Sequence, residues 1–207
     1  NYSSGIVQGN IFDEDGFAAA GVTIKVGDQT TVTDAKGFFR VTEALLNKTG
    51  SVVVAEKPGY FRGIRSFLPV KGTNQVTIKL LKKELIGTIG SSGGKAGLQN
   101  GASVSLLPAS VQRLDGTAYS GDIKVYGIYI DPASADISQI LPGSFMAVNS
   151  AGRAVSLISY GMLAIELETN TGERLQLKNG KPATLRAPIP QDRIQSAPAT
   201  ISMWYVD

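Results

Sequence analysis

Short runs of alternating apolar and polar residues recur along this chain, and they constrain its fold more than any other feature. Successive side chains of a β-strand point to opposite faces, so a period of two indicates a strand with one buried and one wet face. Val76, Ile78 and Leu80, for example, share one face, and polar residues separate them. Runs of this kind at intervals of about 8–12 residues are typical of β-sandwiches.

The first 82 residues have room for six or seven such strands. Clusters of Gly, Asp and Pro separate the runs and supply turns, since Gly accepts a positive φ and Asp caps its own turn. The turns are expected at Asp13–Gly16, Gly27–Asp28, Asp34–Gly37 and Lys57–Gly59. The strands are expected at Ile6–Phe12, Gly21–Val26, Thr30–Thr33, Phe38–Val41, Ser51–Glu56 and Gln75–Leu81.

A second series of strands follows a charged junction. Lys82–Glu84 is predicted to separate the two halves, and Gly87–Gly101, with six glycines, is interpreted as a flexible hairpin or linker. Helix is expected only at Ala44–Asn47 and within Pro132–Ile140. The strands of the second half are expected at Ala102–Leu107, Asp122–Asp131, Ser144–Val148, Val155–Ser159, Met162–Glu168, Arg174–Lys178, Ala183–Arg186 and Thr200–Val206.

Residues 4–81 carry a set of motifs in a fixed order. Gly9–Asp13 is followed by Gly21–Ile24, by Thr33–Phe39 with its Asp-x-x-Gly-x-Phe turn, and by Gly59-Tyr60. This order resembles the carboxypeptidase regulatory-like domain, although alanines replace the proline that usually precedes Gly21. The resemblance implies a seven-stranded, transthyretin-like (prealbumin-like) sandwich. In that enzyme family the domain is an accessory to the peptidase, whose zinc ligands are absent from this sequence.

The second half is similar to the C-terminal region of bacterial envelope proteins that pair such a domain with another β-sandwich. The matching pieces include Tyr119–Val125, Leu141–Ser144 and Ala197–Tyr205. We therefore predict an all-β chain of two tandem β-sandwich domains, residues 1–82 and 83–207. In the related proteins the strand with Trp204 leads into further sandwich, so the second domain is predicted to be truncated at its C-terminus.

Composition excludes several classes of site. The chain contains no His and no Cys. Imidazole is the usual general base near neutral pH, and imidazole and thiolate are the usual zinc ligands. Serine triads, cysteine proteases, zinc hydrolases, haem sites and iron–sulfur clusters are therefore excluded, and we expect no enzyme and no cofactor.

Charge and hydropathy bear on partners. Lys and Arg total 20 against 17 Asp and Glu, but the basic residues are scattered, so nucleic acid is not expected as a partner. The longest apolar stretch, Ala154–Leu167, is shorter than the roughly 20 residues of a transmembrane helix. No apolar segment of the kind found in export signals follows Asn1, so we expect that any export or lipid-attachment signal has been removed or was never present. The resemblance implies an extracytoplasmic location, in the periplasm, on the outer-membrane surface or secreted.

Carboxylates offer two candidate sites. Asp13, Glu14 and Asp15, and separately Asp131 with Asp136, have oxygens for calcium, but neither set has the spacing of a calcium loop, so solvated turns are preferred. Glu166 and Glu168 would lie on one face of a strand, roughly 7 Å apart, and a glycosidase uses two such carboxylates. Without a belt of aromatic residues beside them, they are interpreted as a solvated strand face.

Aromatic residues are the candidate binding groups. Tyr119, Tyr126, Tyr129 and Tyr160 could stack on sugars or contact a partner protein. An isopeptide crosslink of a lysine, as in some surface β-sandwiches, is not distinguishable in the sequence, and the Gly90–Lys95 stretch is not a phosphate-binding loop.

We therefore hypothesise a non-catalytic envelope or surface protein that acts in binding, adhesion or as a structural spacer. Its partner would be an envelope protein or polysaccharide, recognised through Tyr119–Tyr129 and the Pro132–Pro142 loop. The alternative is a carbohydrate-binding module of a polysaccharide-utilisation system, in which a tyrosine on a loop stacks on a sugar ring.

Overall fold

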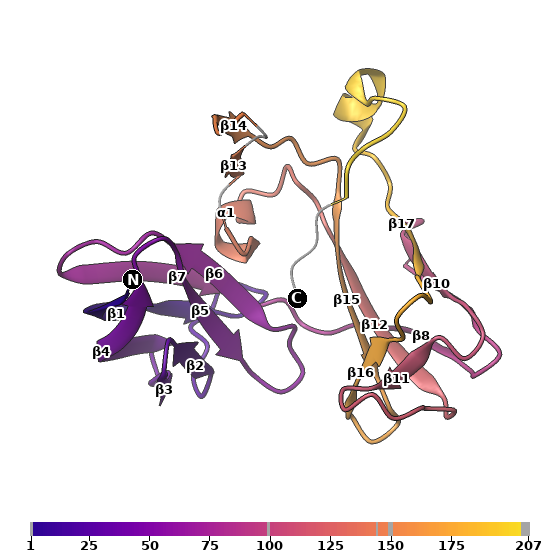
Figure 1. Ribbon diagram of the computed structural model, residues 1–207, viewed down its shortest axis with the longest axis horizontal. Coiled ribbons are helices and arrows are strands. Elements are labelled where there is room, and N and C mark those ends of the chain that lie inside the picture. The colour runs from indigo at the N-terminus through magenta and orange to yellow at the C-terminus, as the bar shows by residue number, and fades with distance from the viewer. Residues whose placement is uncertain (1, 99, 144, 149–150, 204–207) are drawn as a thin grey trace. The chain divides into compact units, whose positions relative to one another are not determined.

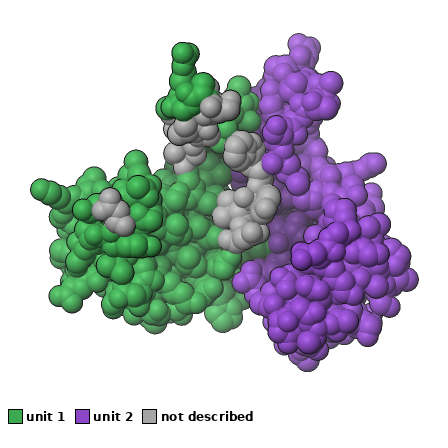
Figure 2. Space-filling view, in the orientation of Figure 1, with its two compact units in different colours: residues 1–82, 133–158, 204–207 green, residues 83–132, 159–203 purple. Residues whose placement is uncertain are grey.

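The chain is all-β, as the alternating runs predict. A computed structural model describes residues 2–98, 100–143, 145–148 and 151–203, and its ribbon is shown in Figure 1. The residues divide into two compact units, coloured separately in Figure 2. Unit 1 contains Asn1–Lys82 and Ala133–Ile158, and unit 2 contains Lys83–Pro132 and Ser159–Met203.

Unit 1 is a sandwich of two sheets. The three-stranded sheet has the order β4-β1-β7, with β1 parallel to β7, and the four-stranded sheet has the order β3-β2-β5-β6. Residues from both sheets, among them Ile11, Phe39 and Val53, form one buried core. The strands are β1 (Tyr2–Phe12), β2 (Thr23–Val26), β3 (Gln29–Val32), β4 (Phe38–Asn47), β5 (Ser51–Glu56), β6 (Gly63–Phe67) and β7 (Thr73–Lys79).

The segment Ala133–Ile158 completes unit 1, although the sequence places it in the second domain. It contains α1 (Ile137–Ile140) and the hairpin of β13 (Met146–Val148) and β14 (Ala154–Ser156). The other boundary of the units, between Lys82 and Lys83, falls within the predicted junction.

Unit 2 contains two further sheets that share a second core. The five-stranded sheet has the order β11-β16-β15-β12-β8, and the three-stranded sheet the order β17-β10-β9. Val125 and Leu167 of the first sheet and Val104 of the second belong to one buried cluster. The elements are β8 (Leu85–Ile89), β9 (Gly94–Gly97), β10 (Ser103–Leu106), β11 (Val111–Arg113), β12 (Ile123–Ile130), β15 (Met162–Glu168), β16 (Arg174–Leu177), β17 (Thr184–Arg186) and the 3-10 helix η1 (Gln191–Ser196).

Three local predictions are wrong. Ala44–Asn47 is not helical but ends β4, where Ala44 and Leu46 face the core. The glycine-rich stretch is neither a flexible linker nor a hairpin, because β8 and β9 occupy much of it, belong to different sheets and carry the buried Ile89 and Ala96. Thr200–Met203 forms no strand, and the rest of that predicted strand lies outside the described residues.

The predicted Asp34–Gly37 turn is confirmed. The Asp34 carboxylate accepts hydrogen bonds from the N–H groups of Lys36 and Phe38, at 2.8 and 2.9 Å. Gly37 has φ +69°, and a Cβ there would lie 2.5 Å from the carbonyl oxygen of Ile11. Glycine therefore serves both the turn and the close approach of two backbones.

The Gly59-Tyr60 turn closes one end of the core and carries a titratable pair. A hydrogen bond to the Glu14 side chain, followed by burial, raises the pKa of Tyr60 from 10.0 to about 12. Glu14 also lies 3.4 Å from the ammonium of Lys82. A tyrosine with a raised pKa contributes stability that is present below pH 10.0 and is lost as the pH rises through about 12.

We expect Glu14→Gln to lower the pKa of Tyr60 towards 10.0, because the carboxylate charge that disfavours the phenolate is removed. Alkaline titration of the tyrosinate absorbance measures this change, and Tyr60→Phe identifies the transition. Titration curves that coincide for the wild-type protein and Glu14→Gln would contradict the pairing.

Candidate functional site

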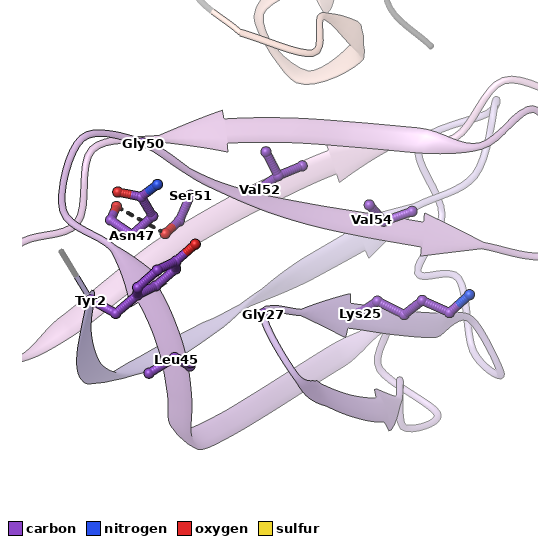
Figure 3. Close-up of a pocket in the computed structure, with 9 residues that line it drawn as sticks. All are labelled: Tyr2, Lys25, Gly27, Leu45, Asn47, Gly50, Ser51, Val52 and Val54. Carbon is purple, nitrogen blue, oxygen red and sulfur yellow. Dashed lines mark hydrogen bonds between the residues drawn. The ribbon is translucent and has the colours of Figure 1, made fainter.

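The strongest candidate for a binding site is an open groove on unit 1, which we call the Tyr2 groove (Figure 3). It has a volume of about 320 Å³. Strands of both sheets of the sandwich contribute to its lining. The lining residues are Tyr2, Lys25, Gly27, Leu45, Asn47, Gly50, Ser51, Val52 and Val54.

The apolar floor of the Tyr2 groove follows from strand alternation. On β5, Val53 and Ala55 face the core, so Val52 and Val54 must face outwards. Tyr2 is paired with Asn47 across β1 and β4, and its side chain is 60% exposed. Aromatic and aliphatic side chains therefore remain in contact with water in a concave surface, which is typical of a recognition site.

Polar groups hold fixed positions around this floor. The Asn47 Oδ1 accepts hydrogen bonds from the N–H and hydroxyl of Thr49, at 3.1 and 2.9 Å, which orients the Asn47 amide. The Ser51 hydroxyl donates to the Asn47 carbonyl, and the Lys25 ammonium lies 2.8 Å from Glu56. The groove thus combines an apolar floor with an amide, a hydroxyl and an ammonium group.

Sequence reasoning did not identify the Tyr2 groove. Tyr2, Leu45 and Val52 lie on three different strands, and only the packing of the two sheets brings them together. The sequence held one weak indication of this groove. On some strands, apolar residues occupy the outward-facing positions as well as the inward-facing ones.

Glu166 and Glu168 lie on one face of β15, as predicted, but that face is not solvated. Their residues are only 8% and 9% exposed. Glu166 accepts from Lys83 Nζ at 2.9 Å and from Arg174 Nε at 2.9 Å, and Glu168 accepts from Lys83 Nζ at 2.6 Å. The prediction of a wet strand face is therefore wrong, because a lysine distant in sequence covers both carboxylates.

The four residues Lys83, Glu166, Glu168 and Arg174, which we call the Glu166 cluster, balance two positive and two negative charges. Burial by itself lowers the pKa of Lys83, but the hydrogen bonds and charges of Glu168 and Glu166 outweigh it and raise the pKa above 10.5. The ammonium also lies 5.8 Å from the ring centre of Tyr126. This arrangement has the composition of a structural ion-pair network.

The four predicted binding tyrosines all lie in unit 2 and use their polar groups or rings internally. Tyr119 donates to the Asp122 carbonyl at 3.0 Å, Tyr129 to the Pro188 carbonyl at 3.3 Å, and Tyr160 to the Ser196 carbonyl at 3.2 Å. Burial, with the charge of Asp131, raises the pKa of Tyr129.

The strand period also separates Tyr126 from Tyr129. The two residues are three positions apart on β12, so their side chains point to opposite faces of the sheet. Tyr126 accompanies the Glu166 cluster, whereas Tyr129 shares the face of the buried Val125. They cannot contribute to one flat binding surface.

The carboxylates suggested for calcium have protein partners. Asp13 accepts hydrogen bonds from the N–H groups of Asp15 and Phe17, Glu14 pairs with Lys82, and Asp136 pairs with Lys79 at 2.7 Å. In the part of the chain that the structure describes, no group of three or more acidic side chains is placed to hold a metal ion.

No helix in the described ranges is both long and apolar enough to cross a bilayer.

Comparison with known proteins gives little further information. No family model and no curated protein matches the sequence. Among solved structures, the Bacillus anthracis TIE protein is similar at 9% identity and a TM-score of 0.32, over 89% of this chain and 45% of that one. A Bacteroides fragilis protein of unknown function, provisionally described as membrane-associated, is similar at 11% identity and a TM-score of 0.31, over 86% and 84%. This chain spans a little under half the length of the TIE protein, and neither likeness carries a functional conclusion.

Proposed function

We propose that this chain is a non-catalytic bacterial cell-envelope or surface protein whose unit 1 binds a partner through the Tyr2 groove. The observation that carries the proposal is the exposed floor of Tyr2, Leu45 and Val52 within a concave surface. A partner that removes this floor from water would stabilise the complex by about 25 cal/mol for each Å² of apolar surface buried. The envelope location rests on the resemblance of residues 4–81 to the carboxypeptidase regulatory-like domain and of the second half to envelope proteins.

Binding through the Tyr2 groove would use a surface that is already formed in the folded chain. The strands that carry the floor belong to a packed sandwich, so little conformational entropy is lost when a partner docks. The polar groups of Asn47, Ser51 and Lys25 would fix the orientation of the partner on the floor. Unit 2 would then have a structural role, as a spacer.

A substitution in the groove tests the proposal. We expect Tyr2→Ala to weaken capture of the partner at least about tenfold, since an aromatic anchor at the centre of an interface contributes about 2 kcal/mol or more and about 1.4 kcal/mol corresponds to tenfold. Phe17→Ala is the matched control, because Phe17 is another exposed aromatic of unit 1, 71% exposed, that does not line the groove. The measurement is capture by the immobilised chain from separated protein and polysaccharide fractions of a bacterial envelope extract.

Two results decide the proposal. Loss of capture with Tyr2→Ala, retention with Phe17→Ala, and unchanged circular dichroism of both variants would support the Tyr2 groove. Equal capture by the wild-type chain and Tyr2→Ala, or no capture from either fraction, would contradict it.

The second candidate function is carbohydrate binding. It is favoured by one observation, the exposed ring of Tyr2 beside the Asn47 amide and the Ser51 hydroxyl, because sugars are held by stacking on aromatic rings and by hydrogen bonds to such groups. Capture from the polysaccharide fraction alone, lost with Tyr2→Ala, would favour this function over protein binding.

A further inference from the structure

A second feature of unit 1, separate from the floor of the Tyr2 groove, is the open edge of β7. This strand ends the order β4-β1-β7, and among the described residues it pairs with β1 alone. Leu80 donates its N–H to the Phe12 carbonyl at 2.8 Å. This bond shows that the even-numbered residues of β7 turn their backbone groups towards β1. Asn74, Val76 and Ile78 therefore direct their backbone groups to β1, whereas Gln75 and Thr77 direct theirs to the open edge.

A groove of about 800 Å³ lies along this edge. We call it the β7 groove. Gln75, Val76 and Thr77 of β7 line one side, and Ser66 and Phe67 of β6, the edge strand of the other sheet, line the opposite side. Residues of α1 contribute to the lining as well. The groove therefore lies where the two sheets of the sandwich end next to each other.

The β6 side of the groove already binds extended main chain. Ser66 donates its N–H to the Pro142 carbonyl at 2.5 Å, which adds one rung to the free edge of β6. Arg65 Nη1 donates to the carbonyls of Ser138 at 2.6 Å and Gly143 at 3.2 Å. A segment of the same chain thus bonds to β6 through its carbonyl groups, whereas among the described residues no strand pairs with the outer edge of β7, which α1 reaches through the ion pair of its N-cap Asp136 with Lys79.

The charge of the lining residues indicates which kind of peptide fits the β7 groove. Of the described residues that line the groove, Arg65 is the single charged one, and the others carry hydroxyl, amide or apolar groups. The outward backbone groups of Gln75 and Thr77 are two residues apart, a spacing of roughly 6.6 Å that another strand reproduces. An extended peptide with an acidic side chain matches both the backbone spacing and the charge.

We propose that the β7 groove binds an extended, acidic peptide segment of a partner protein, which adds to the edge of β7 as a further strand. The main-chain groups of Gln75 and Thr77 form the hydrogen bonds of the pairing, and the guanidinium of Arg65 attracts the carboxylate. β-Strand addition of this kind takes its affinity from main-chain bonds and its specificity from alternate side chains.

The test selects ligands for the whole chain from a displayed library of random dodecapeptides. We expect enrichment of acidic peptides rich in β-branched residues. In the isotope-labelled chain, a selected peptide shifts the amide signals of Gln75 and Thr77 and slows their hydrogen exchange. A library without enrichment, enriched peptides without acidic residues, or shifts confined to other surfaces would overturn the proposal.

A matched pair of proline variants tests the main-chain pairing. Gln75→Pro removes an N–H that points to the open edge and leaves the bonds between β1 and β7 in place. Thr30→Pro is the control: Thr33 donates to the Val22 carbonyl at 3.0 Å, so the antiparallel alternation directs the N–H of Thr30 to the open edge of β3. We expect Gln75→Pro to weaken peptide binding at least about tenfold and Thr30→Pro to leave it unchanged.

N-methylated peptides provide a test that requires no change in the protein. Only every second amide of an added strand faces β7. Methylation of the odd-numbered amides of a selected peptide and methylation of its even-numbered amides should therefore differ: one set should abolish binding and the other should leave it intact. Equal loss of binding with the two methylated peptides would overturn strand addition. Tyr2→Ala should leave peptide binding unchanged, so failure of the Tyr2 groove and failure of the β7 groove are distinguishable.

Discussion

Gly9→Ala is expected to cause a large loss of stability in unit 1. Gly9 lies in β1, the central strand of the three-stranded sheet, directly opposite Val76 of β7. A Cβ at this position would lie 1.7 Å from the carbonyl oxygen of Val76 and 2.8 Å from its carbonyl carbon. Both contacts are with backbone, so no side-chain rotation can relieve them.

The two strands must separate to admit the methyl group, and β1 carries Val7 and Ile11 of the core. Overpacking costs about 1–3 kcal/mol. We expect the upper end of that range, about 3 kcal/mol, in the free energy of unfolding of unit 1. Hydrogen exchange of peptides from β1 and β7, followed by mass spectrometry, measures the loss in unit 1 independently of unit 2.

Gly5→Ala is the matched control on the same strand. A Cβ at Gly5 would lie 2.7 Å from the Leu46 Cδ1, the end of a flexible side chain that can move. We expect a cost of about 1 kcal/mol or less, at the low end of the overpacking range. Similar exchange rates in Gly9→Ala and the wild-type protein would contradict the close approach of β1 and β7.

Lys83→Met is expected to have the largest effect on unit 2. The substitution keeps much of the length of the side chain but removes the ammonium that pairs with Glu166 and Glu168. Breaking a buried ion pair typically costs about 3–5 kcal/mol, because the partner charge remains buried without compensation. Arg174 still pairs with Glu166, so we expect the lower end, about 3 kcal/mol.

Lys25→Met is the control for loss of a charge alone. Lys25 pairs with Glu56 at a similar distance, 2.8 Å, but its side chain is 53% exposed. Exposed pairs contribute about 0–1 kcal/mol. Urea unfolding followed by hydrogen exchange compares the two variants, with β12 and β15 reporting on Lys83→Met and β2 and β5, which carry Lys25 and Glu56, reporting on Lys25→Met. Equal and small losses in both would contradict the role assigned to the Glu166 cluster.

The pH dependence of this difference follows from the sign of the shift. The pKa of Lys83 is raised above 10.5 in the folded chain. Its contribution is therefore complete below pH 10.5 and is lost as the pH rises through the raised value. We expect the gap in stability between the wild-type protein and Lys83→Met to be constant from neutral pH to pH 10.5 and to shrink above this point.

Combined substitution separates pairing from packing. Replacing a whole buried ion network by neutral groups is often close to neutral in stability. We expect Lys83→Met together with Glu166→Gln and Glu168→Gln to recover part of the stability that Lys83→Met loses. A triple variant less stable than Lys83→Met would indicate that the two carboxylates have a further role.

The local pattern of the sequence determined most of the strands and the tight turns. Period-two alternation reports which residues share a face, and it correctly predicted Ser51–Glu56 and Met162–Glu168 as strands. The Asp34–Gly37 turn was equally predictable, because Asp and Gly have local conformational preferences that need no distant partner. These properties are determined within a few residues of chain.

Local pattern failed where burial decided the outcome. The glycines of residues 87–101 predict a linker, yet packing of Ile89 and Ala96 into the core of unit 2 holds two strands there. Ala44–Asn47 has the composition of a helix, but Ala44 and Leu46 gain more from facing the core of unit 1 along β4. In both cases tertiary burial outweighs propensity.

The candidate sites were decided by tertiary structure alone. The sequence placed Glu166 and Glu168 on one face, but only the fold showed that Lys83, more than eighty residues away, covers them. The floor of the Tyr2 groove likewise joins strands from two sheets. The physical reason is that strand period specifies the direction of a side chain and carries no information on what stands opposite, which depends on the register and packing of distant segments.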